Sequence, residues 1–229
     1  MLEVARGLEE GIRQVFTPGT LFEELGFRYV GPANGHSVTS LLEAFEQAKK
    51  VDGPVLVHVE TTKGKGYKYA EDEPVEYHGP SAFDPVAGIE KKKSAAAPSY
   101  TAVFGKAVVR LAELDPRVVA ITASMPDGTG LVPFSERFPE RFLNTGIAEQ
   151  HSVTLAGGLA LGGIRPVVAI YSSFLQRGFD QIFHDVCLMD VPVVFALDRG
   201  GIAGNDGWTH HGLFDYAYFR IFPNTIVMA

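Results

Sequence analysis

A single carboxylate stands at the start of an otherwise small and apolar stretch. Glu149 follows the strand-like segment FLNTG, and the segment SVTLAGGLALGG, which comes after two further residues, is almost wholly small or apolar. A helix with such residues on most of its faces is usually buried, and burying an unpaired carboxylate costs roughly several kcal/mol. Two interpretations therefore stay open: an acidic residue that suits the helix dipole, or a functional acid.

Other residues with chemical potential come where strands are predicted to end. Four such ends read SMPDGTGL, GIAEQH, YSSFLQR and DRGGIAGNDGWTHHG. Each combines glycines, which let the backbone approach a ligand, with a titratable or aromatic side chain. Ligands of open parallel sheets bind at the carboxyl ends of the strands. The convergence favours a ligand-binding role for Glu149.

The elements that would position these residues alternate regularly in the second part of the chain. In chain order we expect a helix at 100–114, strands at 118–124 and 142–146, the small-residue helix, a strand at 165–172, a helix to about 189, a strand at 192–199, a short helix and a strand at 225–229. Near-continuous Val and Ile runs that alternate with helices predict an α/β fold with a doubly wound parallel sheet.

The first part of the chain predicts too few strands for a sheet of its own. We expect helices at 2–16 and 39–50, strands at 27–30 and 54–61, and a structure-poor stretch to 85. Two parallel strands are not self-sufficient, so residues 1–87 are interpreted as the C-terminal part of another α/β domain. Charged and small residues at 88–99 indicate a linker. The abrupt end of 100–229 after TIVMA suggests a fragment whose second domain is truncated.

Composition excludes several classes of protein. The net charge is −7 and the only dense basic run is Lys91–Lys93, which argues against a nucleic-acid surface. The single cysteine, Cys187, excludes an internal disulfide and fits a reducing compartment. No stretch approaches the ~20 apolar residues of a membrane helix, and the start MLEVARGLEEG lacks the features of a signal peptide. We expect a cytoplasmic protein.

Longer motifs are specific enough to identify a family. They are GTLFEELGFRYVGPANGH, KGKGY, YHGPSAFDP, SMPDGTGL, NTGIAEQHSVT, IYSSFLQRGFDQ, HDV and DRGGIAGNDGWTHHG. Together they resemble the 1-deoxy-D-xylulose-5-phosphate synthases, which are thiamine-diphosphate enzymes of the transketolase superfamily, over essentially the whole chain. GIAEQ alone would indicate only the superfamily, whereas YHGP and GNDGWTHHG point to the synthases.

The resemblance implies a fold and a reaction. Residues 100–229 would form the pyrimidine-binding domain of the thiamine-diphosphate-binding fold, and residues 1–87 the end of the first, diphosphate-binding domain. The enzyme would be a transketolase-type transferase that condenses pyruvate with glyceraldehyde 3-phosphate, releases CO2 and forms a precursor of isoprenoids, thiamine and pyridoxal. Thiamine diphosphate, Mg2+ and a homodimer of the complete enzyme are implied. The metal ligands are expected outside this chain, which alone is expected to be inactive.

The resemblance also implies roles for individual residues. Glu149 matches a glutamate that hydrogen-bonds a ring nitrogen of the cofactor's aminopyrimidine and favours the tautomer that deprotonates the thiazolium carbon. Apolar surroundings disfavour a charged carboxylate, so sharing a proton with that nitrogen becomes favourable. His78 matches a histidine that assists proton transfer. The implied cofactor-binding residues are Lys63, Tyr67, Met125, Ile147, Glu149, Phe174 and Arg177. The implied substrate-binding residues are Tyr171, Arg199, Asp206 and His210.

Several of these positions have a plainer alternative. Met125, Ile147 and Phe174 could be core side chains, and Lys63 could be only solvated. His78 could be a turn histidine without function, and His36 is interpreted as a loop or helix-entry residue. Arg199 could serve as a phosphate or carboxylate fork, or could pair with Asp198.

Some features depart from the family. Trp208 stands where a small residue is usual and could reshape the acceptor pocket, and Asn34 replaces a common Asp. The GDG motif for metal and diphosphate is absent from this sequence, so the chain would hold half a cofactor site. Two competing functions stay open: another transketolase-type pyrimidine-binding unit, such as the beta subunit of a 2-oxo acid dehydrogenase, and a non-catalytic assembly module.

Overall fold

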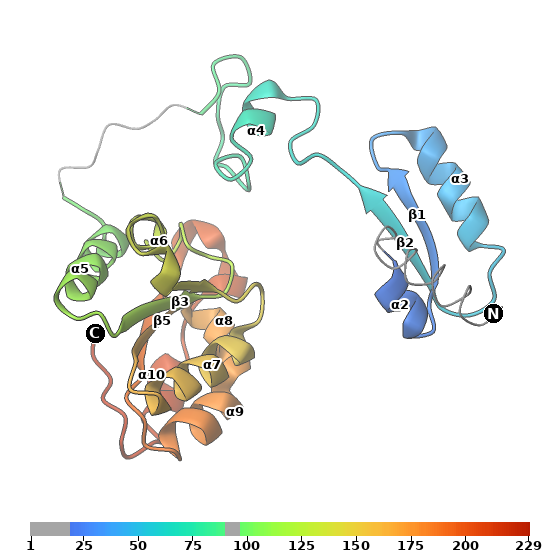
Figure 1. Ribbon diagram of the computed structural model, residues 1–229. Coiled ribbons are helices and arrows are strands. Elements are labelled where there is room, and N and C mark those ends of the chain that lie inside the picture. The colour runs from blue at the N-terminus through green and yellow to red at the C-terminus, as the bar shows by residue number, and fades with distance from the viewer. Residues whose placement is uncertain (1–18, 90–96) are drawn as a thin grey trace. The chain divides into compact units, whose positions relative to one another are not determined.

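The computed structural model describes residues 19–89 and 97–229, and the chain divides into two compact units, Met1–Lys92 and Lys93–Ala229. Each unit is described by itself (Figure 1). The helix predicted at 2–16 and the centre of the predicted linker, 90–96, lie outside the described residues.

The first unit is built around one pair of parallel strands. Its elements are α2 (Thr20–Glu24), β1 (Arg28–Asn34), α3 (Val38–Ala48), β2 (Val55–Glu60) and α4 (Lys68–Asp72). β1 pairs with β2 in parallel, and the Ser37 hydroxyl caps α3 by accepting the Ser40 N–H. Val30, Ala33 and Ala44 form a small buried cluster. The two strands and the helix predicted between them are confirmed.

The second unit contains a four-stranded parallel sheet with the order β4-β3-β5-β6. In chain order its principal elements are α5 (Tyr100–Leu114), β3 (Val118–Thr122), α6 (Val132–Arg137), β4 (Phe142–Asn144), α7 (Glu149–Leu161), β5 (Arg165–Tyr171), α8 (Ser172–Leu175), η2 (Gln176–Gly178), α9 (Phe179–Gln181), η3 (Ile182–Cys187), β6 (Val194–Asp198) and α10 (Asp215–Phe219). The sheet and the order of its strands agree with the expected α/β class.

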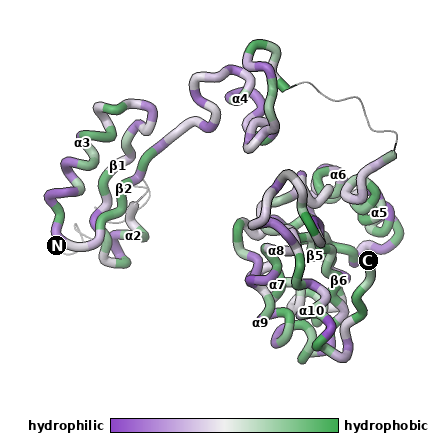
Figure 2. The backbone as a smooth tube through the Cα atoms, turned by 180° about the vertical axis from the view of Figure 1, so that it is seen from behind, coloured by the Kyte–Doolittle hydropathy of each residue, from purple (hydrophilic) through white to green (hydrophobic). Residues whose placement is uncertain are grey.

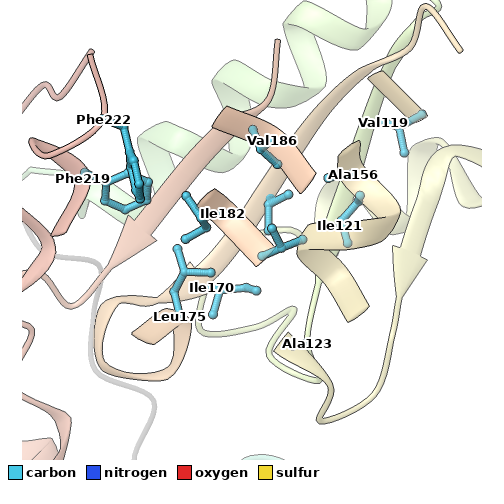
Figure 3. Packing of buried hydrophobic residues seen from close by; sticks show 12 residues of the cluster. Val119, Ile121, Ala123, Ala156, Ile170, Leu175, Ile182, Val186, Phe219 and Phe222 are labelled. Atoms are coloured by element: carbon cyan, nitrogen blue, oxygen red, sulfur yellow. The ribbon is translucent and has the colours of Figure 1, made fainter. Parts of the chain in front are cut away.

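Alternate residues of the strands enter two separate cores. Val119 and Ile121 of β3 pack with Ile182 of η3 and with α7 on one face, as Figure 3 shows. Val118 and Ala120 pack on the other face with α5 and α6. Figure 1 shows helices covering both sides of the sheet, and Figure 2 shows the hydrophobic colouring of β5 between them. This two-sided cover confirms the doubly wound fold.

Three expectations about elements need correction. The predicted strand 225–229 is irregular, with Ile226 and Met228 each 87% exposed, because β6 pairs with β5 and no ladder partner for these residues lies in the described part of the chain. The single helix predicted up to about 189 is instead divided into α8, η2, α9 and the π-helical η3. α6 was missed because six residues are too short to show a helical period.

Within residues 19–89 and 97–229, no helix combines the length and the apolar character that crossing a membrane requires.

Candidate active site

Glu149 is buried and paired. It is the first residue of α7, it is 2% exposed, and its Oε1 accepts a hydrogen bond from Nη1 of Arg177 at 3.2 Å. Its Oε2 accepts no hydrogen bond from the residues that the structure describes. The position suits the helix dipole, as the plainer interpretation expects, yet one acceptor of a nearly inaccessible carboxylate is left for another donor.

The turn before α7 is tied to the neighbouring strand end. Asn144, at the end of β4, accepts the backbone N–H groups of Ser124 and Gly146 through Oδ1, at 2.9 and 3.2 Å. Gly146 has a φ of +75°, and a Cβ built there meets no atom within 4 Å. Glycine therefore allows the left-handed turn that leads into Glu149, and the space beside Gly146 itself is open.

Phe174 lies between three polar or aromatic neighbours. Its ring centroid is 5.5 Å from that of Tyr171 and 5.3 Å from that of His210, and the Arg177 Cζ lies 5.4 Å from it. Phe174 also packs against the main core while staying only partly buried. The Phe174 ring therefore packs against the core, as the plainer alternative expects, and also contacts residues at the edge of the sheet.

Arg199 is the most extensively bonded cation at this edge. Its Nε donates to Asp206 Oδ2 at 2.6 Å, and its Nη1 donates to Asp198 Oδ1 at 2.8 Å and to the Gly128 carbonyl at 3.2 Å. The Cζ also lies 3.9 Å from the ring centroid of Tyr171. Arg199 therefore does pair with Asp198, as the alternative to a phosphate-binding role expects, and it pairs with Asp206 as well.

The protonation of this cluster follows from burial and charge. Burial works against the charge of Arg199, but the hydrogen bond with Asp206 and the electrostatic interactions with Tyr171, Asp198 and Asp206 together outweigh it and raise the pKa of Arg199. Burial raises the pKa of the Tyr171 phenol, partly offset by the nearby Arg199 cation. At neutral pH the cluster therefore presents a permanent cation stacked on a neutral phenol.

Met125 and Ile147 have different surroundings. Met125 packs against the core, and its Sδ accepts the Tyr171 N–H at 3.3 Å. Ile147 is 85% exposed, two residues before Glu149. The core alternative is thus wrong for Ile147, because the turn after β4 directs its side chain away from the sheet.

The loop from β6 to α10 carries Asp206 and His210. Its base is closed by Gly201 and Gly212, which exchange backbone hydrogen bonds of 2.8 and 2.9 Å. Asp215, just beyond it, accepts hydrogen bonds from the Ser172 and Tyr218 hydroxyls. The sequence analysis did not identify Ser172, Asp215 or His211 as functional residues. The one sequence feature that could have indicated the hydrogen bonds of Asp215 is Tyr218, three residues later on the same short helix.

The candidates of the first unit lie on its Gly- and Tyr-rich stretch. Lys63 and His78 are exposed, and the His78 N–H donates to the Val75 carbonyl in a turn. Tyr67 packs in a ring cluster with Tyr77 and Phe83, at centroid separations of 5.5 and 6.0 Å. Its buried Oη has no hydrogen-bond partner in the described residues.

His36 has a more definite structural role than a loop position suggests. Its Nε2 accepts the Thr62 N–H at 2.7 Å, so it joins the loops after β1 and β2. In the described ranges, no group of three or more His, Cys, Asp or Glu side chains is placed to hold a metal ion.

The parallel sheet, its crossovers and the polar edge place residues 97–229 in the doubly wound α/β class. The family model described as "Transketolase, pyrimidine binding domain" matches residues 96–229, and the chain belongs to this family. Residues 1–61 match the family model described as "1-deoxy-D-xylulose-5-phosphate synthase".

Curated relatives match the whole chain. It is 58% identical over 229 residues to 1-deoxy-D-xylulose-5-phosphate synthase 2 of Geobacter sulfurreducens, and 58% identical over 231 residues to the 1-deoxy-D-xylulose-5-phosphate synthase of Syntrophus aciditrophicus. Each match covers 100% of this chain but 37% and 36% of the relative. The chain thus spans little more than a third of the length of these relatives.

A solved structure supports the fold. Transketolase from Campylobacter jejuni matches with a TM-score of 0.51 at 20% identity, over 90% of this chain and 43% of that one. At this identity the likeness concerns the fold alone.

Proposed function

We propose that the chain carries the pyrimidine side of the cofactor site of a 1-deoxy-D-xylulose-5-phosphate synthase. In this proposal residues 1–87 end the diphosphate-binding domain, 88–99 link the domains and 100–229 belong to the pyrimidine-binding domain. The observation that supports this proposal most directly is the buried Glu149. Its Oε1 accepts a hydrogen bond from Arg177, while its Oε2 accepts none from the described residues. The relatives named above support the synthase over the beta subunit of an oxo acid dehydrogenase.

The residues present fit the aminopyrimidine of thiamine diphosphate. A carboxylate with one free oxygen can accept a ring N–H, the open space at Gly146 leaves room beside it, and Phe174 offers a ring for stacking. The exposed Ile147 provides apolar surface next to the carboxylate. When bound, thiamine diphosphate supplies a nucleophilic carbon and an electron sink.

The chain's own residues then have separate tasks. Glu149 holds a proton between its carboxylate and the ring nitrogen, and Arg177 fixes that carboxylate in place. Tyr171, Arg199, Asp206 and His210 face the substrates, pyruvate and glyceraldehyde 3-phosphate. Arg199 is the donor suited to a phosphate because its Nη2 makes no hydrogen bond with the described residues and can donate to a phosphate oxygen, while Asp206 and Asp198 hold its Nε and Nη1.

The remaining parts of the proposal concern the complete enzyme. In the complete enzyme Lys63 and Tyr67 bind the cofactor, and His78 assists proton transfer. Mg2+ is held by residues outside this chain, and the complete enzyme is a homodimer. A cytoplasmic location fits the single Cys187.

A fragment of the cofactor tests the half-site directly. We would titrate the 15N-labelled chain with 4-amino-5-hydroxymethyl-2-methylpyrimidine and follow the backbone amides by NMR. Saturable shifts are expected at Ile147, Glu149 and Phe174, and they should vanish in Glu149→Ala. Glu113→Ala, on an exposed part of α5, is the matched control. Shifts that are absent, or that persist in Glu149→Ala, would favour a non-catalytic module.

A further inference from the structure

The loop between β6 and α10 carries two of the proposed substrate-facing residues, Asp206 and His210. We propose that His211 is a positioning residue that holds this loop in its folded shape. The proposal rests on the proposed function only for what Asp206 and His210 do, since the loop's shape is a property of the chain alone.

The base of the loop is anchored independently of His211. Gly201 and Gly212 exchange two backbone hydrogen bonds, and a Cβ on Gly212 would lie 2.0 Å from the Ser172 Oγ. Asp215 accepts hydrogen bonds from Ser172 and from Tyr218. The chain is therefore anchored at both ends of the loop, and the shape of residues 202–211 depends on contacts within the segment and on those of Asp206 with Arg199 and His210 with Phe174.

His211 supplies the contact that spans this segment. Its Nδ1 accepts the backbone N–H of Ala203 at 3.0 Å, and the residue is half-buried. The other hydrogen bonds within 202–211 that the structure describes join residues no more than three positions apart, as in the turn from Asp206 N–H to the Ala203 carbonyl. The His211 ring thus joins the beginning of the segment to its end.

Two contacts at the site depend on this shape. Asp206 Oδ2 lies 2.6 Å from Arg199 Nε, and the His210 ring centroid lies 5.3 Å from that of Phe174. Both residues stand between Ala203 and His211 in the sequence. Joining Ala203 to His211 restricts where these two side chains can go, so His211 acts through them.

A pair of substitutions separates the hydrogen bond from the bulk of the ring. His211→Asn keeps an acceptor, because Asn Oδ1 takes the place of Nδ1, whereas His211→Leu fills space without an acceptor. Amide hydrogen exchange of the 15N-labelled full chain reports the Ala203 N–H, and exchange of the Arg199 Nε–H reports the ion pair with Asp206. Amides of Ile121 and Val168, in the buried strands, report the global fold.

Loss of one hydrogen bond changes a local opening equilibrium by about 10-fold. We expect His211→Leu to accelerate exchange at Ala203 by about that factor and to accelerate exchange at the Arg199 Nε–H, with the strand amides unchanged. In His211→Asn the exchange rates should stay within about twofold of those of the wild type, because this substitution keeps the hydrogen bond to the Ala203 N–H. The steady-state anisotropy of Trp208, the only tryptophan, should fall in His211→Leu alone.

Two results would overturn the proposal. One is unchanged Ala203 exchange in His211→Leu. The other is equal acceleration in both variants, which would assign the effect to the ring's shape. If the proposed function failed, the aminopyrimidine titration would show no shifts while these exchange rates kept their predicted pattern, so the two failures are distinguishable.

Discussion

The Arg177 guanidinium reaches into the sheet edge to the carboxylate of Glu149, with 3.2 Å between Nη1 and Oε1. The Arg177 side chain is 56% exposed, whereas that of Glu149 is 3% exposed. The pair therefore joins a solvated cation to a desolvated anion. Such an arrangement orients the carboxylate through Oε1 and leaves Oε2 without a hydrogen bond from the described residues.

Removing Arg177 should destabilise the second unit. Arg177→Met leaves the buried carboxylate unpaired, and because the arginine is half-solvated we expect a loss of about 1–2 kcal/mol in the free energy of unfolding. Urea denaturation measures it. The double variant Arg177→Met/Glu149→Gln should recover most of the loss, and a double variant no more stable than Arg177→Met would contradict the pairing.

Glu149→Gln should separate function from stability. Glutamine keeps the size and one acceptor but cannot share a proton with a ring nitrogen, so turnover of the complete enzyme should fall by ~100-fold or more. Circular dichroism and the unfolding midpoint should show a folded variant. Activity within about threefold of wild type would return Glu149 to the helix-dipole interpretation.

Arg199→Ala should affect one substrate more than the other. Arg199 follows β6 at the start of a glycine-rich loop, and its Nη2, which makes no hydrogen bond with the described residues, can donate to a phosphate. Loss of a desolvated charged contact costs roughly 2–5 kcal/mol. In the complete enzyme the KM for glyceraldehyde 3-phosphate should rise far more than that for pyruvate. Steady-state kinetics with each substrate varied in turn measures both. An equal rise would mean that Arg199 braces the pocket through Asp198 and Asp206.

Two neighbouring glycines should respond differently to the same substitution. A Cβ at Gly212 would lie 2.0 Å from Ser172 Oγ and 2.7 Å from the Arg199 carbonyl, whereas at Gly200 the nearest atom is 3.8 Å away. Gly212→Ala should therefore cost about 1–3 kcal/mol of stability, the range for overpacking. Gly200→Ala should be nearly neutral. Thermal denaturation compares the two, and equal midpoints would refute the tight fit at the base of the loop.

Asp115 should contribute to stability in a defined pH window. Its hydrogen bond from the Arg117 side chain, helped by the Arg117 backbone N–H, lowers its pKa from 3.8 to about 2. A depressed folded-state pKa means that the contribution is complete above the unfolded pKa and is lost as the pH falls from about 4 to about 2.

Asp115→Asn measures that window. Its destabilisation relative to wild type should be largest near pH 7 and should vanish as the pH approaches 2, when wild-type Asp115 is itself protonated. Asp180→Asn, which removes an exposed carboxylate of α9, controls for net charge. A difference for Asp115→Asn that stayed constant from pH 7 to about 2 would contradict the ion-pair account.

Local sequence patterns were enough to predict the elements with a strong period and the edge of the sheet at which the candidate site residues gather. Helix 100–114 and the parallel strands follow from apolar periodicity, and the place of Glu149 follows from the rule that ligands bind after parallel strands. These features depend on neighbours within a few residues, so local reasoning suffices. The failure at 225–229 has the same origin: a β-prone segment becomes a strand only when a partner pairs with it.

Which residues contact one another at that edge depends on how the elements pack, and local patterns did not predict it. The tertiary structure joined Arg177 to Glu149, stacked Arg199 on Tyr171, exposed Ile147 and placed His211 against Ala203. The Arg177–Glu149 contact joins η2 to the start of α7, so it depends on how the helices that follow β4 and β5 pack. The Arg199–Tyr171 contact depends on the register of β5 with β6, in which Tyr171 pairs with Asp198. No local period encodes such distances, because they arise from packing layers whose partners lie far apart in the sequence.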